Sequence, residues 1–426
     1  MKACVSLVVC LIGAAAPAPV LAQPQPLTID QAVNEAVEKN LSLIAERWNV
    51  AVADAAIVTA RLRPNPVMSG SADHLDWLGT GFSDLNGAGP PEYALRVDMP
   101  FERGAKRELR TEVASAAKSV AEAQLADTVR KLRLDVTLAS IDVLEAKAKL
   151  TLARQNLESL QRLVDLNQRR LTSGALAPLE VTRSRVAMLQ YRSSEKAAEL
   201  NVTQTRLKLH TLVGRRASDP LIDVDEPLGT PPATLPVDLD TLLAAARTSR
   251  PDVLALRRDQ ARTQADMRLQ VAQGRVDYTI GSEYRRQQGV NGTGNSVGFF
   301  VSVPLPVFNR NQGEIARADA EHNKADKSLA ALETTVAGEV ASAAQEFESA
   351  RQILADMERD LVKLAADARA GTVYVYQAGA TSLLDVLDAQ RTFNDTMDSY
   401  YTAQAAYRRA EARLSLVSGV DPRAAR

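Results

Sequence analysis

Cysteine is nearly absent from this sequence, and the two that occur stand close to its start. Cys4 and Cys10 lie within residues 1–22, which have the pattern of a secretory signal peptide: Lys2 supplies a positive charge, a short apolar run follows, and Ala22 ends a plausible cleavage site. The mature chain would then contain no thiol. A disulfide scaffold, a thiolate metal site and a cysteine nucleophile are therefore excluded.

Two other interpretations of this first segment, a membrane anchor and a lipid attachment site, are less favoured. A membrane anchor needs roughly 20 apolar residues, and the run at residues 5–16 is shorter. Lipid attachment at Cys10 would need a small residue just before the cysteine, whereas residues 7–9 are bulky and apolar.

Long apolar runs, aromatic residues and an excess of either charge are also scarce. No stretch after the signal approaches bilayer length, so an exported chain of this kind is soluble in the periplasm, secreted, or a β-barrel. Aromatic residues are 4% of the sequence, and the net charge of −1 gives no basic field for nucleic acid. Alanine, leucine and charged residues dominate, as is typical of long helices packed through small residues.

The motifs of enzymes are missing as well. The sequence has no nucleophile elbow, phosphate-binding loop or His-Glu-x-x-His motif, and none of its many carboxylate pairs stands out as an acid and a base. His74, His210 and His322 are far apart in the sequence, so no metal site is predicted. We expect a protein that is not an enzyme and that has no cofactor.

The most informative feature that is present is an internal repeat. Three landmarks recur in the same order, each about 205 residues later. The first copies are Met99-Pro100-Phe101, Gly174-Ala175 with Leu179-Glu180-Val181, and Leu212-Val213-Gly214; the second copies are Leu305-Pro306-Val307, Gly379-Ala380 with Leu384-Asp385-Val386, and Leu416-Val417-Ser418-Gly419. The predicted organisation is a signal peptide at 1–22, a first repeat at 23–218, a proline-rich linker at 219–237, a second repeat at 238–419 and a tail at 420–426.

Each repeat is predicted to contain a helix, a strand pair, a very long helix, a turn and a returning helix. Residues 29–61 have apolar side chains at helical spacing. Between Gly104 and Gly174 there is neither proline nor glycine, and this stretch would form a helix roughly 100 Å long. Such a rod cannot bury its own apolar stripe, so we expect the chain after Gly174 to fold back along it. The second repeat predicts the same pair at 311–377 and 382–417.

Four short segments interrupt the helical pattern. They alternate apolar and polar side chains, as strands with one apolar face do, and they lie at residues 67–77, 93–99, 276–284 and 297–303. Polar, glycine-rich loops at 79–89 and 289–294 join the members of each pair. Two hairpins packed on a soluble helical core would fit this pattern equally well.

A β-barrel built from these strands would have to be shared among subunits, because the smallest barrels need about eight strands. Aromatic side chains collect at the two interfaces of a membrane-spanning barrel. The candidates for such a girdle are Trp77, Tyr93, Tyr278 and Tyr284. Taken singly, each of them could equally be an ordinary core residue.

The order, spacing and duplication of these motifs resemble those of the TolC-like outer membrane factors of tripartite efflux pumps. Leu27-Thr28-Ile29-Asp30-Gln31-Ala32 is similar to the family's first helix, and Arg63-Pro64-Asn65-Pro66 looks like its entry into the first strand. The resemblance covers residues 27–419. It is closest to the heavy-metal branch, which exports cobalt, zinc and cadmium or copper and silver, at Arg250-Pro251-Asp252-Val253, at residues 101–107 and at residues 304–313.

The resemblance implies a mainly helical fold in a homotrimer, with a coiled-coil helical barrel in the periplasm and twelve strands, four per subunit, in one transmembrane β-barrel. It implies an outer-membrane location, a periplasmic adaptor and an inner-membrane RND-type pump as partners, and passive export of heavy-metal cations. Export of drugs or other small molecules is the alternative within the family. A soluble periplasmic helical scaffold is the alternative outside it.

The resemblance also places the turn glycines, Gly174 and Gly379, at a periplasmic tip that contacts the adaptor and closes the channel. From the residues alone they could be hairpin turns and nothing more. Tyr376 and Glu180 match a tyrosine and an acidic residue that hold the family's tip closed by hydrogen bonds. Thr381, however, stands where an arginine completes that latch in the best-known members, which puts the charged part of the latch in doubt.

Asp385 and Asp388 are three residues apart and so share one face of a helix. By their position after Gly379 they match the acidic residues that constrict the family's tunnel. In a trimer they would stack two rings of carboxylates, which favour cations, and repulsion between them would raise some of their pKa values. Without the resemblance they would be read as solvated helix residues.

Overall fold

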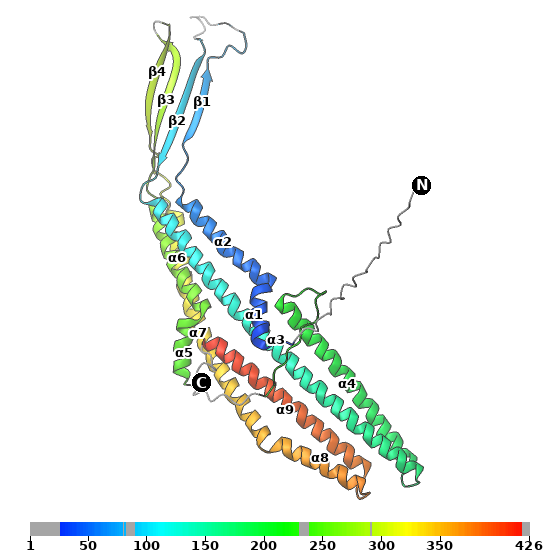
Figure 1. The fold of residues 1–426 in the computed structure, drawn as a ribbon. Coiled ribbons are helices and arrows are strands. Elements are labelled where there is room, and N and C mark those ends of the chain that lie inside the picture. The colour runs from blue at the N-terminus through cyan, green and yellow to red at the C-terminus, as the bar shows by residue number, and fades with distance from the viewer. Residues whose placement is uncertain (1–25, 80, 82–89, 230–237, 290–291, 420–426) are drawn as a thin grey trace, which may run out of the picture.

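The computed structural model describes residues 26–79, 81, 90–229, 238–289 and 292–419. These residues form a long, narrow molecule with a β-sheet at one end and two helical hairpins at the other (Figure 1). The predicted fold class, mainly helical with four strands in each chain, is confirmed. The predicted signal peptide, with Cys10, lies outside the described residues.

The two halves of the described chain contain the same succession of elements. The first half consists of α1 (Ile29–Lys39), α2 (Leu41–Arg61), β1 (Val67–Asp73), β2 (Glu92–Phe101), α3 (Lys106–Thr172) and α4 (Pro178–Val213). The second half consists of α5 (Leu239–Ser249), α6 (Pro251–Gln273), β3 (Tyr278–Gly289), β4 (Gly292–Ser302), α7 (Gln312–Asp356), a π-helical turn (Met357–Leu361), α8 (Val362–Gln377) and α9 (Leu383–Ser418). The exact boundaries of the two repeats stay a prediction.

Backbone details repeat along with the elements. Ala105 and Asn311 precede the long helices α3 and α7, and both have a left-handed backbone, with φ of 56° and 64°. Gly214 and Gly419 end α4 and α9 in the same conformation, with φ of 85° and 69°. The recurrence of such uncommon conformations at matching places supports a duplication.

Two predicted helices are interrupted. The helix expected at 29–61 breaks at Asn40, whose extended backbone ends α1 and whose side chain accepts a hydrogen bond from the backbone N–H of Leu43 to begin α2. The helix expected at 311–377 contains the π-helical turn Met357–Leu361, where α7 gives way to α8. Met357–Leu361 contains no proline or glycine, so the sequence pattern gave no signal for that turn.

The four strands form one antiparallel sheet in the order β1-β2-β3-β4. Leu95 pairs with Tyr284, and Tyr284 pairs with Val297, which fixes the register across three strands. The prediction of a loop at 289–294 is wrong for most of these residues, because β3 continues to Gly289 and β4 already begins at Gly292. Among the described residues, none of the helices combines the length and the apolar character that a membrane crossing requires.

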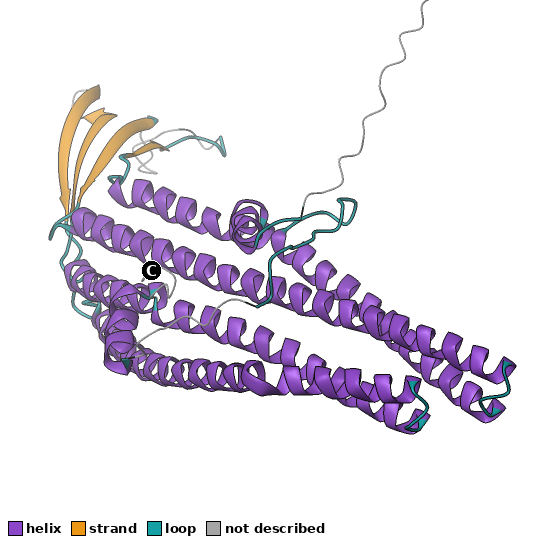
Figure 2. Ribbon diagram, turned by 60° about the horizontal axis from the view of Figure 1, so that its bottom comes forward, coloured by secondary structure: helices purple, strands orange, loops and turns teal. Residues whose placement is uncertain are grey.

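The helices run side by side along the molecule, and the turns of the α3–α4 and α8–α9 hairpins lie at the same end (Figure 2). One core cluster joins α1, α3 and α4 near the middle, and a second joins α5, α7 and α9. The predicted linker contributes to the first cluster: Ile222 and Val224 are buried there, and Val224 pairs with Leu27. A third, smaller cluster lies between the two hairpins.

Candidate functional site: the sheet surface and the hairpin tip

The sheet has one apolar and one polar face, as its register requires. The apolar face carries large side chains that are all exposed in the single chain, namely Met68, Leu95, Val97, Ile280, Val297, Phe299 and Val301. The most exposed of these is Phe299, at 82%. An exposed apolar surface of this extent indicates contact with lipid or with another protein.

The opposite face of the sheet carries charged pairs. Arg96 forms an ion pair with Asp98 at 2.9 Å, and its guanidinium lies 4.3 Å from the centre of the Phe300 ring. Glu283 accepts a hydrogen bond from Arg285 at 2.9 Å. Such a face suits a water-filled interior.

The predicted girdle residues divide between the two ends of the apolar face. Tyr278 stacks on Phe101 at the helical end, with ring centres 5.5 Å apart. Tyr284 and Tyr93 lie on the same face toward the far end, and Tyr284 is six residues, or roughly 20 Å, along the strand from Tyr278. On strands tilted by about 35–45° it corresponds to roughly 15 Å of height, which fits within the ~25 Å apolar band of outer-membrane barrels.

Trp77 does not belong to this arrangement. It follows β1, which ends at Asp73, and its side chain is 86% exposed. The strand expected at 67–77 is therefore shorter than predicted, and Trp77 lies in the loop beyond it. The girdle role of the four aromatic residues stays a prediction.

At the other end of the molecule, the two hairpin turns have the same backbone geometry. Gly174 and Gly379 have φ of 75° and 79°. In each turn the next residue donates its backbone N–H to a carbonyl five residues back, from Ala175 to Arg170 and from Ala380 to Val375. A Cβ at either glycine would meet no atom within 4 Å, so only the left-handed backbone requires glycine there.

The two hairpins are joined by polar contacts of Tyr376, whose partners the sequence did not indicate. The Tyr376 side chain is buried at 3% exposure, and its hydroxyl donates a hydrogen bond of 2.7 Å to Oδ1 of Asn167 on α3. Arg170 donates to the carbonyls of Tyr376 (3.2 Å) and Gln377 (2.6 Å), and its guanidinium lies 5.2 Å from the Tyr376 ring centre. We call Asn167, Arg170 and Tyr376 the hairpin clasp.

Glu180 does not contact Tyr376 by a hydrogen bond. It forms an ion pair with Arg183 on its own helix, at 2.9 Å. Thr381 donates to Asp385 instead of bridging the hairpins. Within the single chain Tyr376 is bonded to Asn167 and Arg170, and burial raises the pKa of its hydroxyl. No local pattern could have revealed these contacts, because they join residues more than 200 positions apart. The latch role of Tyr376 and Glu180 stays a prediction.

A second polar contact joins α3 to α9 above the clasp. Asn156 is fully buried; its Oδ1 accepts a hydrogen bond from Gln390 at 2.9 Å, and its Nδ2 donates to Asn394 at 2.5 Å. A cavity of about 560 Å³ lies between these two sets of contacts, with Leu163 and Tyr376 in its wall. The hairpins are therefore held together at two levels with space between.

Asp385 and Asp388 are both exposed, but only Asp385 has partners among the described residues. Asp385 accepts hydrogen bonds from the hydroxyls of Thr381 (2.6 Å) and Ser382 (2.7 Å) and from the backbone N–H of Ser382 (3.0 Å). These bonds begin α9 and lower the pKa of Asp385. Within one chain the shift is opposite to the increase that we expected.

The duplication gives these carboxylates counterparts in the first turn. At the repeat offset, Asp385 corresponds to Glu180 and Asp388 to Arg183. The first turn is therefore followed by a neutralised pair, and the second turn by two negative charges. This asymmetry concentrates negative charge on the start of α9.

The three histidines lie in different parts of the molecule. His74 lies after β1, His210 on α4 bonds the carbonyl of Arg216 at 2.7 Å, and His322 on α7 contacts the Thr263 hydroxyl at 3.1 Å. Within the described ranges, no three histidine or carboxylate side chains are grouped so that they could hold a metal ion.

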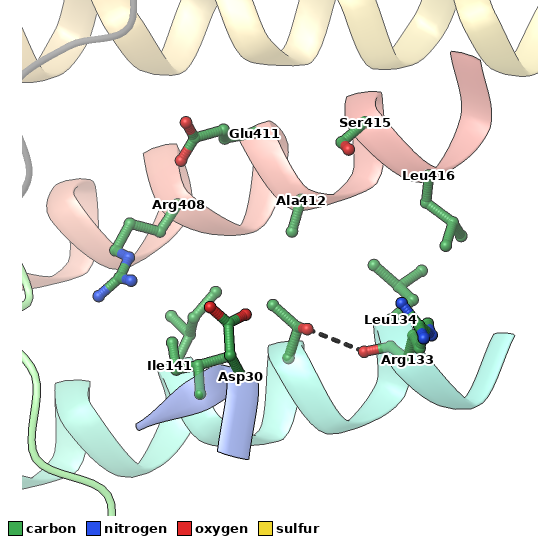
Figure 3. A pocket seen from close by; sticks show the side chains of 11 residues that line it. Asp30, Arg133, Leu134, Ile141, Arg408, Glu411, Ala412, Ser415 and Leu416 are labelled. Atoms are coloured by element: carbon green, nitrogen blue, oxygen red, sulfur yellow. Dashed lines mark hydrogen bonds between the residues drawn. The ribbon is translucent and has the colours of Figure 1, made fainter. Parts of the chain in front are cut away.

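A cavity of about 240 Å³ lies midway along the molecule, between the start of α1, α3 and α9 (Figure 3). Asp30 and Arg133 approach it from α1 and α3, whereas the carboxylate of Glu411, which also lines it, points to the other side of α9. Arg408, at its edge, is buried and already donates to the Pro227 carbonyl (3.0 Å) and to Glu226 (3.2 Å). The cavity marks the seam between the two halves of the chain.

The model of the outer membrane efflux protein family matches residues 32–215 and 242–420, which is most of this sequence. The chain belongs to the outer membrane efflux protein family. This membership confirms an outer-membrane efflux channel, and with it the predicted location and the absence of an enzymatic role. The soluble scaffold is set aside.

Individual relatives are distant. The chain is 26% identical over 367 residues to the cobalt-zinc-cadmium resistance protein CzcC of Cupriavidus metallidurans, covering 86% of this chain and 84% of that protein. It is 23% identical to nodulation protein T of Rhizobium leguminosarum bv. trifolii, over 92% and 85% of the two chains. A crystal structure of CusC matches with a TM-score of 0.74 at 18% identity, over 92% of each chain, and supports the fold.

Proposed function

We propose that three copies of this chain form a passive export duct for heavy-metal cations across the outer membrane. The observation that carries the proposal is the four-stranded sheet with one exposed apolar face, attached to helical hairpins that extend far from it. A sheet with lipid on one face and water on the other needs this division of side chains.

Strand supply requires more than one copy, and the number three is taken from the resemblance to the TolC-like family. The order β1-β2-β3-β4 leaves both β1 and β4 with an open edge, and an open edge cannot lie in lipid. Pairing β4 of one copy with β1 of the next closes the sheet, and three copies would supply twelve strands, which exceeds the minimum of about eight. The long helices would then line a tunnel in the periplasm.

The hairpin tip is the proposed gate and docking end. The clasp holds the α8–α9 hairpin against α3, and Asp385 and Asp388 are exposed just beyond the Gly379 turn. In a trimer these carboxylates would form rings at the entrance and favour cations. The turns around Gly174 and Gly379 would meet a periplasmic adaptor, which in turn would connect to an RND-type pump in the inner membrane.

The proposal also names the exported substrate, heavy-metal cations. Support comes from CzcC, a relative named for cobalt, zinc and cadmium resistance. Because the described residues group no metal ligands, the cation would pass without a dedicated site and the pump would select it. Export of another small molecule is the second candidate, since nodulation protein T matches over a similar share of the chain.

A deletion strain of the host tests the cargo. Loss of the gene is expected to lower tolerance to cobalt, zinc and cadmium salts and to leave tolerance to dyes and antibiotics unchanged, and a plasmid copy should restore metal tolerance. The reverse pattern, with normal metal tolerance and increased sensitivity to organic compounds, would reject metal export and favour the second candidate.

A further inference from the structure

The apolar stripe on β4 does not stop where the strand ends. β4 ends at Ser302, but the alternation continues beyond it, so that one line of apolar side chains comprises Val297, Phe299, Val301, Val303 and Leu305. Val307 and Phe308 follow directly. Leu305 is 81% exposed and Phe308 is 92% exposed, among the highest values for apolar residues in the described chain. We call residues 303–308 the junction loop, since they connect the sheet to α7.

The junction loop is held in shape from the helical side. Two prolines, Pro304 and Pro306, restrict its backbone. The carbonyl of Pro306 accepts a hydrogen bond from Nε of Arg310 (3.2 Å), and the carbonyl of Phe308 accepts one from Nε2 of Gln312 (3.1 Å). Two carbonyls of the loop are thus bonded by side chains at or just before the start of α7, while the apolar side chains stay exposed.

Two arginines adjoin this loop, and a third lies in a neighbouring hollow. Arg275 and Arg310 line one hollow with Leu305, while Arg63 lines a second hollow with Phe101; Lys106 contributes to both. Arg63, Arg275 and Arg310 have no carboxylate within ion-pair distance among the residues that the structure describes. Apolar tips beside unpaired arginines suit the boundary between acyl chains and phosphate head groups.

We propose that the junction loop is a membrane-interface anchor, which seats Leu305, Val307 and Phe308 among phospholipids of the periplasmic leaflet. This rests on the proposed function, because the sheet must span the outer membrane for the loop to reach that leaflet. The loop sets how deeply each subunit sits in the membrane. Unpaired arginines beside it contact the lipid phosphates.

Depth along the strand supports this position. Phe299 pairs with Ser282, between Tyr278 and Tyr284, and so lies near the middle of the apolar band. Thr279 pairs with Ser302, so Val303, the next residue, is level with Tyr278 at the helical end of the band. Leu305 and Phe308 therefore reach the head-group region.

A neighbouring copy of the chain is the alternative to lipid as the partner that covers the junction loop. That copy would meet β4 along its open edge, through backbone hydrogen bonds in the plane of the sheet. Val297, Phe299 and Val301, from which the stripe continues into the junction loop, lie on the face of the sheet, perpendicular to those bonds. Lipid is therefore the occupant that the geometry favours.

Tryptophan quenching by brominated lipids tests the anchor. Replacing the two native tryptophans (Trp48→Phe, Trp77→Phe) gives a silent background for the full chain. Into it Phe308→Trp, Phe299→Trp or Phe300→Trp is introduced. Each protein is reconstituted in phosphatidylcholine–phosphatidylglycerol vesicles whose acyl chains carry bromine either near the head group or near the chain end, and membrane insertion is checked by flotation.

The anchor predicts loss of fluorescence at position 308 with bromine near the head group, and at position 299 mainly with bromine near the chain end. Position 300, on the polar face, should keep its fluorescence. Quenching at 299 without quenching at 308 would overturn the anchor and favour contact with a neighbouring copy. Absence of quenching at both positions would instead reject the membrane-spanning sheet itself.

Discussion

At the scale of single residues, the clasp is the contact whose loss should have the clearest effect. Tyr376→Phe removes the hydroxyl that Asn167 accepts and leaves a buried amide oxygen unpaired, at a cost of about 1 kcal/mol or more. The open tip should become roughly fivefold more populated. Cells that make the variant should therefore become sensitive to vancomycin, a large antibiotic that an intact outer membrane excludes.

Tyr374→Phe is the matched control for this change, because Tyr374 lies on the same helix but is 74% exposed. It should leave vancomycin resistance as it is in the wild type. If the two variants gave the same resistance, the clasp would have no role in closing the tip.

The two carboxylates after Gly379 should differ in their response to acid. Asp385→Ala together with Asp388→Ala is expected to raise conductance and reduce cation preference in planar bilayers, because both rings of charge are lost. Asp388→Asn alone leaves Asp385, whose pKa is lowered by Thr381 and Ser382 below the usual 3.8. A lowered pKa keeps the carboxylate ionised, so cation preference in this variant should persist down to pH 3.8, where an ordinary aspartate is half protonated. Disappearance of the preference well above that pH would contradict the proposed role of Asp385.

At the scale of elements, an ion pair fastens α1 to the end of α4. Arg215 donates two hydrogen bonds to Glu35, at 2.8 and 2.7 Å, and lowers the pKa of Glu35 from 4.5 to about 2. Since the folded pKa is depressed, the pair stabilises the fold above pH 4.5, and this contribution is lost as the pH falls toward 2.

Glu35→Gln should accordingly lower the melting temperature at pH 7, and the difference from wild type should shrink between pH 4.5 and 2. Glu38→Gln, at an exposed position of the same helix, is the control and should change little. A difference for Glu35→Gln that stayed constant over this pH range would show that the ion pair is not its cause. Thermal unfolding followed by circular dichroism gives both curves.

The strands permit a second test at this scale. Phe299→Arg places a charge in the middle of the apolar face, and in lipid this costs about 2–4 kcal/mol. Ser71→Arg puts the same charge on the polar face of β1 and should be tolerated. The amount of protein in outer-membrane fractions should fall for Phe299→Arg only; equal amounts of the two variants would argue against lipid on that face.

What the sequence could predict at this scale depends on whether the signal is local. The alternation in 93–99 and 276–284 and the two turn glycines are local patterns, and β2, β3 and both hairpins were found from them. The break at Asn40, the π-helical turn and the end of β1 before Trp77 were not, because hydrogen bonding and packing decide them. Asn167 and Arg170 were missed as partners of Tyr376 for the same reason, since Asn167 and Tyr376 meet only after both hairpins have formed.

At the scale of the whole molecule, the duplication explains both the elongated shape and the sheet whose edges one copy leaves open. Each half supplies one strand pair and one long hairpin, and the halves meet along α3 and α9. The result still has two open sheet edges and an exposed apolar face. A single copy therefore cannot be the functional unit in a membrane.

The mass of the assembly extracted from the outer membrane is the measurement that tests the proposed duct most directly. Native mass spectrometry of protein released from outer-membrane fractions in mild detergent should give a single species with three times the mass of the mature chain. A protein that leaves the outer membrane as a monomer, or that stays in the soluble fraction, would contradict a duct with a shared barrel.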